Sequence, residues 1–204
     1  MRAVIICGGE IKDYEYTKKQ IRDSDMVICA DSGYDHAVRM RLYVSVVVGD
    51  FDSVESVPDD VETIKYPPRK NLTDSEIAIK HARGMGFKDF MMVGATGARM
   101  DHTLTNILML KSFMERGETC VIIDEHNKIM MTESKLDIFE PPGATISLIP
   151  LTDCAGVTTT NLEYPLVDAD MFVGKGLGVS NKSTDAHSVV SIKSGTLLVV
   201  VAND

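Results

Sequence analysis

Apolar and polar positions alternate along the first 128 residues in a pattern that predicts an α/β fold. Short apolar runs typical of strands take turns with stretches of helical periodicity. The apolar runs are AVIIC, MVICA, SVVV, ETIKY, DFMMV and TCVII, and the helical stretches lie near residues 14–23, 33–41, 73–84 and 101–116. This alternation is typical of a mostly parallel sheet with helices on both faces.

From about residue 129 the pattern changes to short strand-like runs separated by Gly, Pro, Asn and Asp, without a convincing helix. Such runs predict an antiparallel sandwich or barrel. We therefore expect two domains, an α/β domain over residues 1–128 and an all-β domain over residues 129–204.

Two helix starts can be predicted more closely. TDSE at 73–76 has the form of a capping box, in which Thr73 accepts a bond from the Glu76 amide while Glu76 reaches back. Asp101 likewise precedes a helical stretch and is expected to begin that helix. Its apolar face is expected to hold the four residues Leu104, Ile107, Leu108 and Met114.

Acidic residues end the predicted strands or open the predicted helices, namely Asp31, Asp50, Asp52, Asp74, Glu76 and Asp101. In an open α/β sheet the carboxyl ends of the strands and the adjoining helix N-termini share one edge, so these acids can meet there. Clustered carboxylates repel one another unless a cation stabilises them. Oxygen ligands favour Mg²⁺ or Ca²⁺ over zinc. With Mg²⁺, which keeps waters and phosphate oxygens in its shell, the natural co-ligand is a nucleoside polyphosphate.

Most of these acids also have a purely structural interpretation. Thr73, Asp74 and Glu76 could only cap a helix, and Asp31 could only turn the chain into one. The pair Asp50 and Asp52 is harder to explain in that way. Carboxylates directly behind a buried strand need solvation or a cation, because burying a charge is costly.

Basic side chains stand close to the acidic motifs. Arg69 and Lys70 precede one predicted helix, and Arg99 stands two residues before Asp101. Guanidinium and ammonium groups bind phosphate oxygens and could stabilise charge during phosphoryl-type transfer. His102 is either a donor near the helix start or a phosphate contact. The chain has no GxxxxGK[ST] motif, which excludes a P-loop enzyme.

Composition narrows the class of protein. A hydrophobic share of 44% and a charged share of 25% over 204 residues are ordinary for a globular protein, and a net charge of −9 argues against nucleic-acid binding. No apolar run approaches the roughly 20 residues that span a bilayer, so we expect no membrane association and a cytoplasmic location. The four cysteines are far apart and lack CxxC spacing, which predicts reduced core thiols.

Five motifs follow one another along nearly the whole chain. They are ADSG at 30–33, GDFDS at 49–53, TDSEIA at 73–78, GATGARMDHTLTNI at 94–107 and SN at 180–181. Together they resemble the thiamine pyrophosphokinase (thiamine diphosphokinase) family, and GDFDS followed by RMDHTL is the most specific part. The resemblance implies an N-terminal α/β domain for ATP, a C-terminal β-sandwich for thiamine, and a homodimer with active sites between subunits.

The activity that the resemblance implies is transfer of a pyrophosphate group from ATP to the hydroxyl of thiamine, giving thiamine diphosphate and AMP with Mg²⁺ required. Carried over by position, the implied catalytic residues are Asp50, Asp52, Asp74 and Asp101, of which the first three also bind the metal. The implied ATP contacts are Asp31, Lys70, Thr73, Thr96, Gly97, Arg99 and His102. The implied thiamine contacts are Tyr164, Ser180 and Asn181.

Members of this family often carry Trp in the stretch that reads NLEYPL here, whereas this chain has Tyr164 and no Trp at all. A tyrosine ring can still stack on the cationic ring of thiamine. Alternatively, Tyr164 is an edge residue of the β domain.

Two other functions are compatible with parts of the sequence. VVVGDFDSV fits a phosphatase of the haloacid dehalogenase type, with Asp50 as nucleophile and Asp52 as acid/base. The phosphatase hypothesis leaves the other motifs of the chain unexplained. In phosphatases of this type, the motif with the two aspartates normally follows the first strand. A catalytically silent thiamine- or nucleotide-binding regulator is the third hypothesis, although a binder has little need for so many acids.

Overall fold

The computed structural model describes residues 1–49, 61–66 and 72–202. The chain forms two compact units, Met1–Glu125 and His126–Asp204. Three of the site residues expected from the sequence, the acids Asp50 and Asp52 and the basic residue Lys70, lie outside the described residues.

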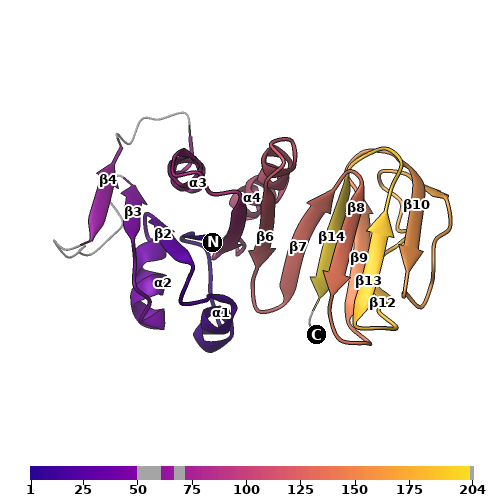
Figure 1. Ribbon diagram of the computed structural model, residues 1–204, viewed down its shortest axis with the longest axis horizontal. Coiled ribbons are helices and arrows are strands. Elements are labelled where there is room, and N and C mark those ends of the chain that lie inside the picture. Colours follow the sequence, from indigo (N-terminus) through magenta and orange to yellow (C-terminus); the bar gives the residue numbers. More distant parts are fainter. Residues whose placement is uncertain (50–60, 67–71, 203–204) are drawn as a thin grey trace. The chain divides into compact units, whose positions relative to one another are not determined.

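The first unit is built on a parallel sheet (Figure 1). Its strands lie side by side in the order β6, β5, β1, β2, β3, β4, and each neighbouring pair is parallel. Their bounds are Ala3–Ile6 (β1), Met26–Ala30 (β2), Val46–Gly49 (β3), Glu62–Lys65 (β4), Asp89–Val93 (β5) and Thr119–Ile123 (β6). The parallel α/β prediction for this part of the chain is confirmed.

In the described part of this unit, the helices that cover the sheet are α1 (Tyr14–Gln20), α2 (Gly33–Met40), α3 (Asp74–Gly84) and α4 (Met100–Met114). Figure 1 shows α1 and α2 on one side of the sheet and α3 and α4 on the other. Central strands are therefore buried on both faces: every residue of β1 is fully inaccessible. Unbroken apolar strands such as AVII follow directly from that two-sided burial.

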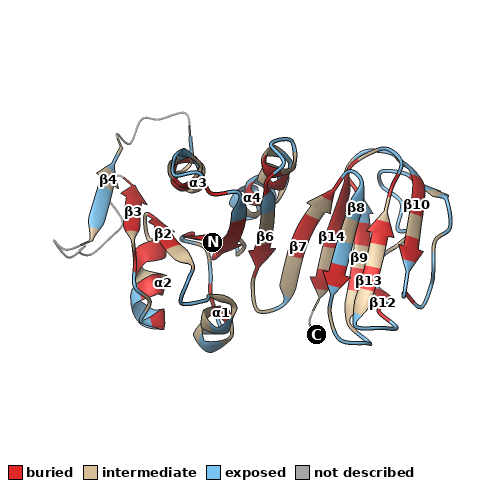
Figure 2. Cartoon of the chain, viewed as in Figure 1, coloured by how far each residue is buried: buried red, intermediate tan, exposed pale blue. Residues whose placement is uncertain are grey.

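The second unit is all β, as the sequence predicts. Its strands are β7 (Asn127–Thr132), β8 (Lys135–Phe139), β9 (Thr145–Pro150), β10 (Cys154–Thr160), β11 (Ala169–Met171), β12 (Asn181–Lys182), β13 (His187–Ser191) and β14 (Leu197–Ala202). Neighbouring strands run antiparallel in two groups, β12-β9-β14-β7 and β11-β10-β13-β8. Alternate residues of β9 and β13 are buried, as the red bands in Figure 2 show, so each strand turns one face to the core.

Helix α3 begins with the predicted capping box. The Glu76 amide donates to Thr73 Oγ1 at 3.2 Å, and the Thr73 amide donates to Glu76 Oε2 at 2.8 Å. Two amides at the start of the helix thereby gain partners that the helix itself cannot supply.

We expect Thr73→Ala to lower the free energy of unfolding by about 1 kcal/mol, because the Glu76 amide loses its acceptor. Chemical denaturation checks this. The matched control is Thr105→Ala, which removes a hydroxyl that only bonds back to the Asp101 carbonyl within α4. Equal losses in the two variants would contradict a specific capping role for Thr73.

Helix α4 differs from its prediction in two respects. It begins at Met100 with Arg99 as N-cap, so Asp101 lies in the first turn and does not cap the helix. Its buried residues are Asn106, Leu110 and Phe113, whereas two of the four residues expected on the apolar face, Leu104 and Leu108, are 52% and 56% exposed. The expected face was wrong because apolar residues surround this helix almost evenly, so spacing alone does not select one side.

Candidate active site

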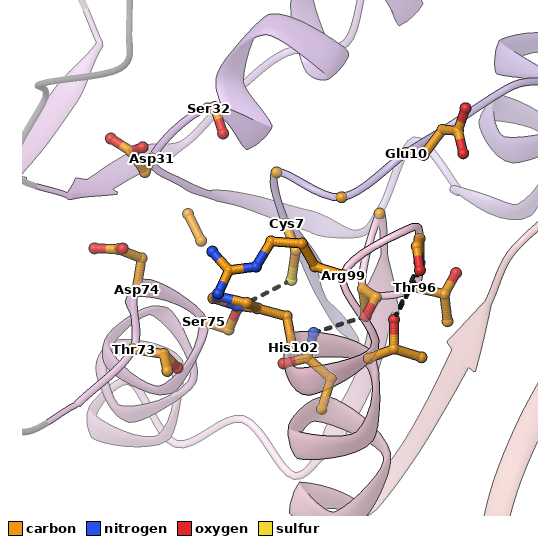
Figure 3. A pocket seen from close by; sticks show the side chains of 18 of the residues that line it. Cys7, Glu10, Asp31, Ser32, Thr73, Asp74, Ser75, Thr96, Arg99 and His102 are labelled. Atoms are coloured by element: carbon orange, nitrogen blue, oxygen red, sulfur yellow. Dashed lines mark hydrogen bonds between the residues drawn. The ribbon is translucent and has the colours of Figure 1, made fainter.

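A cavity of about 670 Å³ opens at the carboxyl ends of β1, β2 and β5 (Figure 3). Three loops form most of its wall: the first loop (residues 7–10), the second loop (residues 30–32) and the third loop (residues 94–99). The starts of α3 and α4 complete it, through Thr73, Asp74, Ser75, His102, Thr103 and Asn106. The sequence pattern predicts ligands at this edge of the sheet, and six of the seven implied ATP contacts line the cavity: Asp31, Thr73, Thr96, Gly97, Arg99 and His102.

The loops approach one another at backbone distance, which requires glycine. The Gly9 amide donates to the Gly94 carbonyl oxygen at 2.7 Å, and a Cβ atom on Gly9 would come within 2.4 Å of that oxygen. A Cβ atom on Gly33, where α2 begins, would lie 2.0 Å from the Ile6 carbonyl oxygen. Gly94 has a φ of 62°, a region that L side chains rarely adopt. The cavity therefore has a wall of closely packed main chain.

The third loop is held in place by a side chain of α4 and by Asp124, the residue that follows β6. Asn106 is buried and its Nδ2 donates to the Ala95 carbonyl oxygen at 2.7 Å. Thr96 Oγ1 donates to Asp124 Oδ2 at 2.7 Å. These contacts fix the loop that holds three of the implied ATP contacts, Thr96, Gly97 and Arg99.

Two of the predicted acids face the cavity. Asp31 follows β2 in the left-handed conformation with a φ of 47°, and Asp74 is the first residue of α3. Gly49, at the end of β3, packs against Asp31, since a Cβ atom on it would lie 3.0 Å from Asp31 Oδ1. Asp50 is the next residue in the sequence. In Figure 3 Asp31 and Asp74 lie on the same side of the cavity.

Arg99 and Asp101 form an exposed ion pair at the cavity rim. Arg99 Nη2 lies 2.5 Å from Asp101 Oδ2, and both side chains are mostly solvent-accessible. The hydrogen bond from Arg99 lowers the pKa of Asp101 to about 2, so this carboxylate is charged at neutral pH. Arg99 lines the cavity, whereas Asp101 does not.

The remaining predicted ATP contacts separate into two groups. Thr73, Thr96, Gly97 and His102 all line the cavity. Lys70, like the acids Asp50 and Asp52, lies outside the described residues. The roles given to all of these residues stay predictions.

Cys7 and Ser75 line the cavity and were not predicted as site residues. Ser75 Oγ donates to Cys7 Sγ at 3.3 Å. Burial raises the pKa of the Cys7 thiol to about 11, so it is protonated and a poor nucleophile at neutral pH. All four cysteines are free, as expected from their spacing. The signal that could have pointed to Cys7 was the Gly-Gly pair directly after the first strand.

The second unit places two of the predicted thiamine contacts side by side. Asn181 is buried, its Oδ1 accepts from the Tyr164 amide at 3.0 Å, and its Nδ2 donates to the Tyr164 carbonyl oxygen at 2.7 Å. Tyr164 itself is 66% exposed. Ser180 precedes Asn181 with a φ of 58°, and its amide donates to Ser147 Oγ. Asn181 therefore fixes the backbone that presents the Tyr164 ring.

Replacing Asn181 by alanine is expected to cost about 2 kcal/mol of unfolding free energy, because the Tyr164 amide and carbonyl lose the two hydrogen bonds that the buried Asn181 side chain makes to them. Thermal or chemical denaturation measures the loss. Asn161→Ala is the control, since Asn161 makes one exposed side-chain bond to the His187 carbonyl. A loss no larger than that of Asn161→Ala would show that Asn181 does not hold this segment.

Within the described ranges, no helix is long and apolar enough to cross a membrane. The same residues contain no group of three or more His, Cys, Asp or Glu side chains arranged to hold a metal ion.

Family models match both parts of the chain. The model of the thiamin pyrophosphokinase catalytic domain matches residues 17–122, which is more than half of the chain and contains most of the cavity wall. The chain belongs to the thiamin pyrophosphokinase family. The model of the vitamin B1 binding domain of thiamin pyrophosphokinase matches residues 128–199, a span that includes Tyr164 and Asn181.

Individual relatives agree with the family models. The chain is 29% identical over 165 residues to the thiamine pyrophosphokinase of Bacillus subtilis (strain 168), covering 76% of this chain and 77% of the relative. It is 21% identical over 187 residues to thiamin pyrophosphokinase 1 of Caenorhabditis elegans, covering 84% and 76%.

Solved structures share the fold. The thiamine pyrophosphokinase crystal structure from Bacillus subtilis has a TM-score of 0.90 at 24% identity, with 100% of both chains covered. The thiamin pyrophosphokinase of Candida albicans has a TM-score of 0.80 at 16% identity, covering 100% of this chain and 90% of that one. The mixed α/β and antiparallel β architecture is thus that of the family.

Proposed function

We propose that this protein is a thiamine diphosphokinase, which transfers a pyrophosphate group from ATP to the hydroxyl of thiamine and releases AMP. Membership of the family carries the proposal, because both its catalytic and its vitamin B1 binding models match. The cavity at the carboxyl edge of the parallel sheet supports an ATP site in the first unit. The assignment of ATP to residues 1–128 and thiamine to residues 129–204 is part of the proposal.

The chemistry of the cavity suits a triphosphate. Main-chain groups of the first and third loops and the N-terminus of α3 can approach phosphate oxygens closely, since glycine leaves room and the helix dipole favours negative charge. Arg99 lines the cavity, and its guanidinium offers further N–H donors to a phosphate besides those that contact Asp101.

Asp31 and Asp74 fit a magnesium site, because both offer carboxylate oxygens to the same cavity. Asp50 and Asp52, which lie outside the described residues, complete the proposed set by family resemblance. When bound, Mg²⁺ would neutralise charge on the phosphates of ATP.

The residues of the chain would mainly position the reactants. The thiamine hydroxyl must be held in line with the β-phosphorus while the bond to the α-phosphate oxygen breaks and AMP leaves. The proton of the hydroxyl passes to a base as the new bond forms. Asp101 is a weak candidate for that base, because its pKa of about 2 makes it a poor proton acceptor at neutral pH.

The thiamine side of the proposal uses the second unit. The exposed ring of Tyr164 is free to stack on a cationic heterocycle, with its backbone fixed by Asn181. Ser180 lies beside this pair in the sequence. A homodimer with active sites at the subunit interface, and a cytoplasmic location, complete the proposal by family resemblance.

A coupled assay of AMP release tests the proposal directly. We expect AMP to form only when ATP, thiamine and Mg²⁺ are all present. Release of inorganic phosphate from simple monoesters without AMP would instead favour the phosphatase hypothesis. Binding of thiamine or ATP with no turnover under any condition would favour the silent regulator.

A further inference from the structure

A chain of side-chain hydrogen bonds contacts the first loop from outside the cavity. Arg39 Nη1 donates to Tyr14 Oη at 3.0 Å, Tyr14 Oη lies 2.8 Å from His36 Nδ1, and His36 Nε2 lies 2.8 Å from the Gly9 carbonyl oxygen. Tyr14 is the first residue of α1, whereas His36 and Arg39 lie three residues apart on α2. None of the three lines the cavity, so their connection to it runs through Gly9.

The groups at the two ends of this hydrogen-bonded series can each act in only one way, as donor or as acceptor. They therefore determine which atom carries the proton in every hydrogen bond between them. A carbonyl oxygen only accepts, so His36 Nε2 must carry a hydrogen and donate it to Gly9. A guanidinium only donates, so the Tyr14 oxygen accepts from Arg39. In neutral His36 the bare Nδ1 then accepts the Tyr14 hydroxyl proton. Arg39, Tyr14, His36 and Gly9 thus form one directed series of donors and acceptors.

Neutral His36 is the form that the surroundings favour. Partial burial lowers the pKa of His36, and the charge of Arg39 acts in the same direction, against opposing contributions from the Gly9 carbonyl and Asp35. The Tyr14 and His36 rings also pack at 5.7 Å, and the Arg39 guanidinium lies 5.8 Å from the Tyr14 ring centre. The series is therefore packed as well as hydrogen-bonded.

Fixing the Gly9 carbonyl also fixes the next amide. The peptide between Gly9 and Glu10 is trans, so its N–H points opposite to the carbonyl, away from His36. The Glu10 nitrogen lies beside Gly97, since a Cβ atom on Gly97 would come within 3.1 Å of it. Among the described residues, no backbone carbonyl accepts a hydrogen bond from this amide. Glu10 and Gly97 both line the cavity.

We propose that Arg39, Tyr14 and His36 are positioning residues for the nucleotide, which hold the first loop by the Gly9 carbonyl so that the Glu10 amide is presented to a phosphate oxygen. This inference rests on the proposed function, because it takes the ligand of the cavity to be ATP. It adds a set of residues outside the cavity that determine affinity for the nucleotide and leave affinity for thiamine unchanged.

Steady-state kinetics of His36→Leu and His36→Gln test the proposal. Leucine removes both hydrogen bonds, and we expect the KM for ATP to rise about 10-fold, the scale of one lost hydrogen bond, with the KM for thiamine unchanged. Glutamine keeps an N–H that can reach the Gly9 carbonyl, so its KM for ATP is expected to return close to the wild-type value. His81→Leu is the control, because His81 is a partly buried histidine on α3 that does not line the cavity.

Hydrogen–deuterium exchange of residues 7–12 in the nucleotide-free protein provides a second readout. We expect faster exchange in His36→Leu than in wild type, His36→Gln or His81→Leu. Unchanged exchange together with an unchanged KM for ATP would overturn the positioning role even if the enzyme is active. A lower kcat in His36→Leu with an unchanged KM for ATP would also overturn the positioning role. If wild type releases no AMP, the proposed function fails separately.

Discussion

Asp74→Asn is expected to lower kcat/KM for ATP by about 100-fold, the usual scale for removing a charged group that acts on a metal or on transition-state charge. Asp74 lies at the start of α3 and lines the cavity together with Asp31. Asparagine keeps the size of the side chain but loses the charge that a magnesium ion would need. The Mg²⁺ concentration for half-maximal activity should rise in the same variant, and the AMP-release assay with a Mg²⁺ titration measures both.

Asp89→Asn is the matched control for this experiment. Asp89 begins β5, so it stands at the end of that strand remote from the third loop, and its Oδ1 accepts from Thr119 Oγ1. An asparagine oxygen can keep that bond, so activity should stay near the wild-type level. Wild-type activity and an unchanged Mg²⁺ requirement in Asp74→Asn would show that Asp74 does not serve the metal or the phosphates.

The architecture could be predicted because the order of apolar and polar residues in a strand shows whether one or both of its faces are buried. β1 and β3 are unbroken apolar runs buried throughout, and β13 alternates as a one-sided strand does. Helix α4 could not be oriented in this way. Its buried face includes Asn106, whose amide is satisfied by the Ala95 carbonyl, a partner that becomes visible only after the third loop is placed.

The site was predicted in part for a similar reason. Asp31 and Asp74 could be placed at one edge of the sheet, because parallel strands put their carboxyl ends together. The first loop was not predicted as a cavity wall. Its contribution depends on main-chain approaches between Gly9 and Gly94 and on the side chain of His36, and such long-range contacts leave no local signature in sequence spacing.

Gly9→Ala is expected to reduce both stability and activity, with a loss of about 2 kcal/mol or more in unfolding free energy, as for other overpacked sites. A Cβ atom at this position would lie 2.4 Å from the carbonyl oxygens of both Gly94 and Thr96. Because both oxygens belong to the main chain, neither can move aside by changing a rotamer. The first and third loops must separate, which breaks the bond from the Gly9 amide to Gly94 and widens the proposed phosphate site.

Gly84→Ala separates this effect from the general cost of replacing a glycine. Gly84 is the last residue of α3, and a Cβ atom there would meet nothing within 4 Å. Alanine should be neutral or stabilise the protein by up to about 1 kcal/mol, since it restricts the unfolded chain and favours helix. The denaturation midpoint and the rate of AMP release, measured for Gly9→Ala and for Gly84→Ala, show whether the two substitutions differ. If Gly9→Ala matched Gly84→Ala in both measurements, the two loops would not be in main-chain contact in the working protein, and the cavity wall could not present amides to a phosphate as proposed.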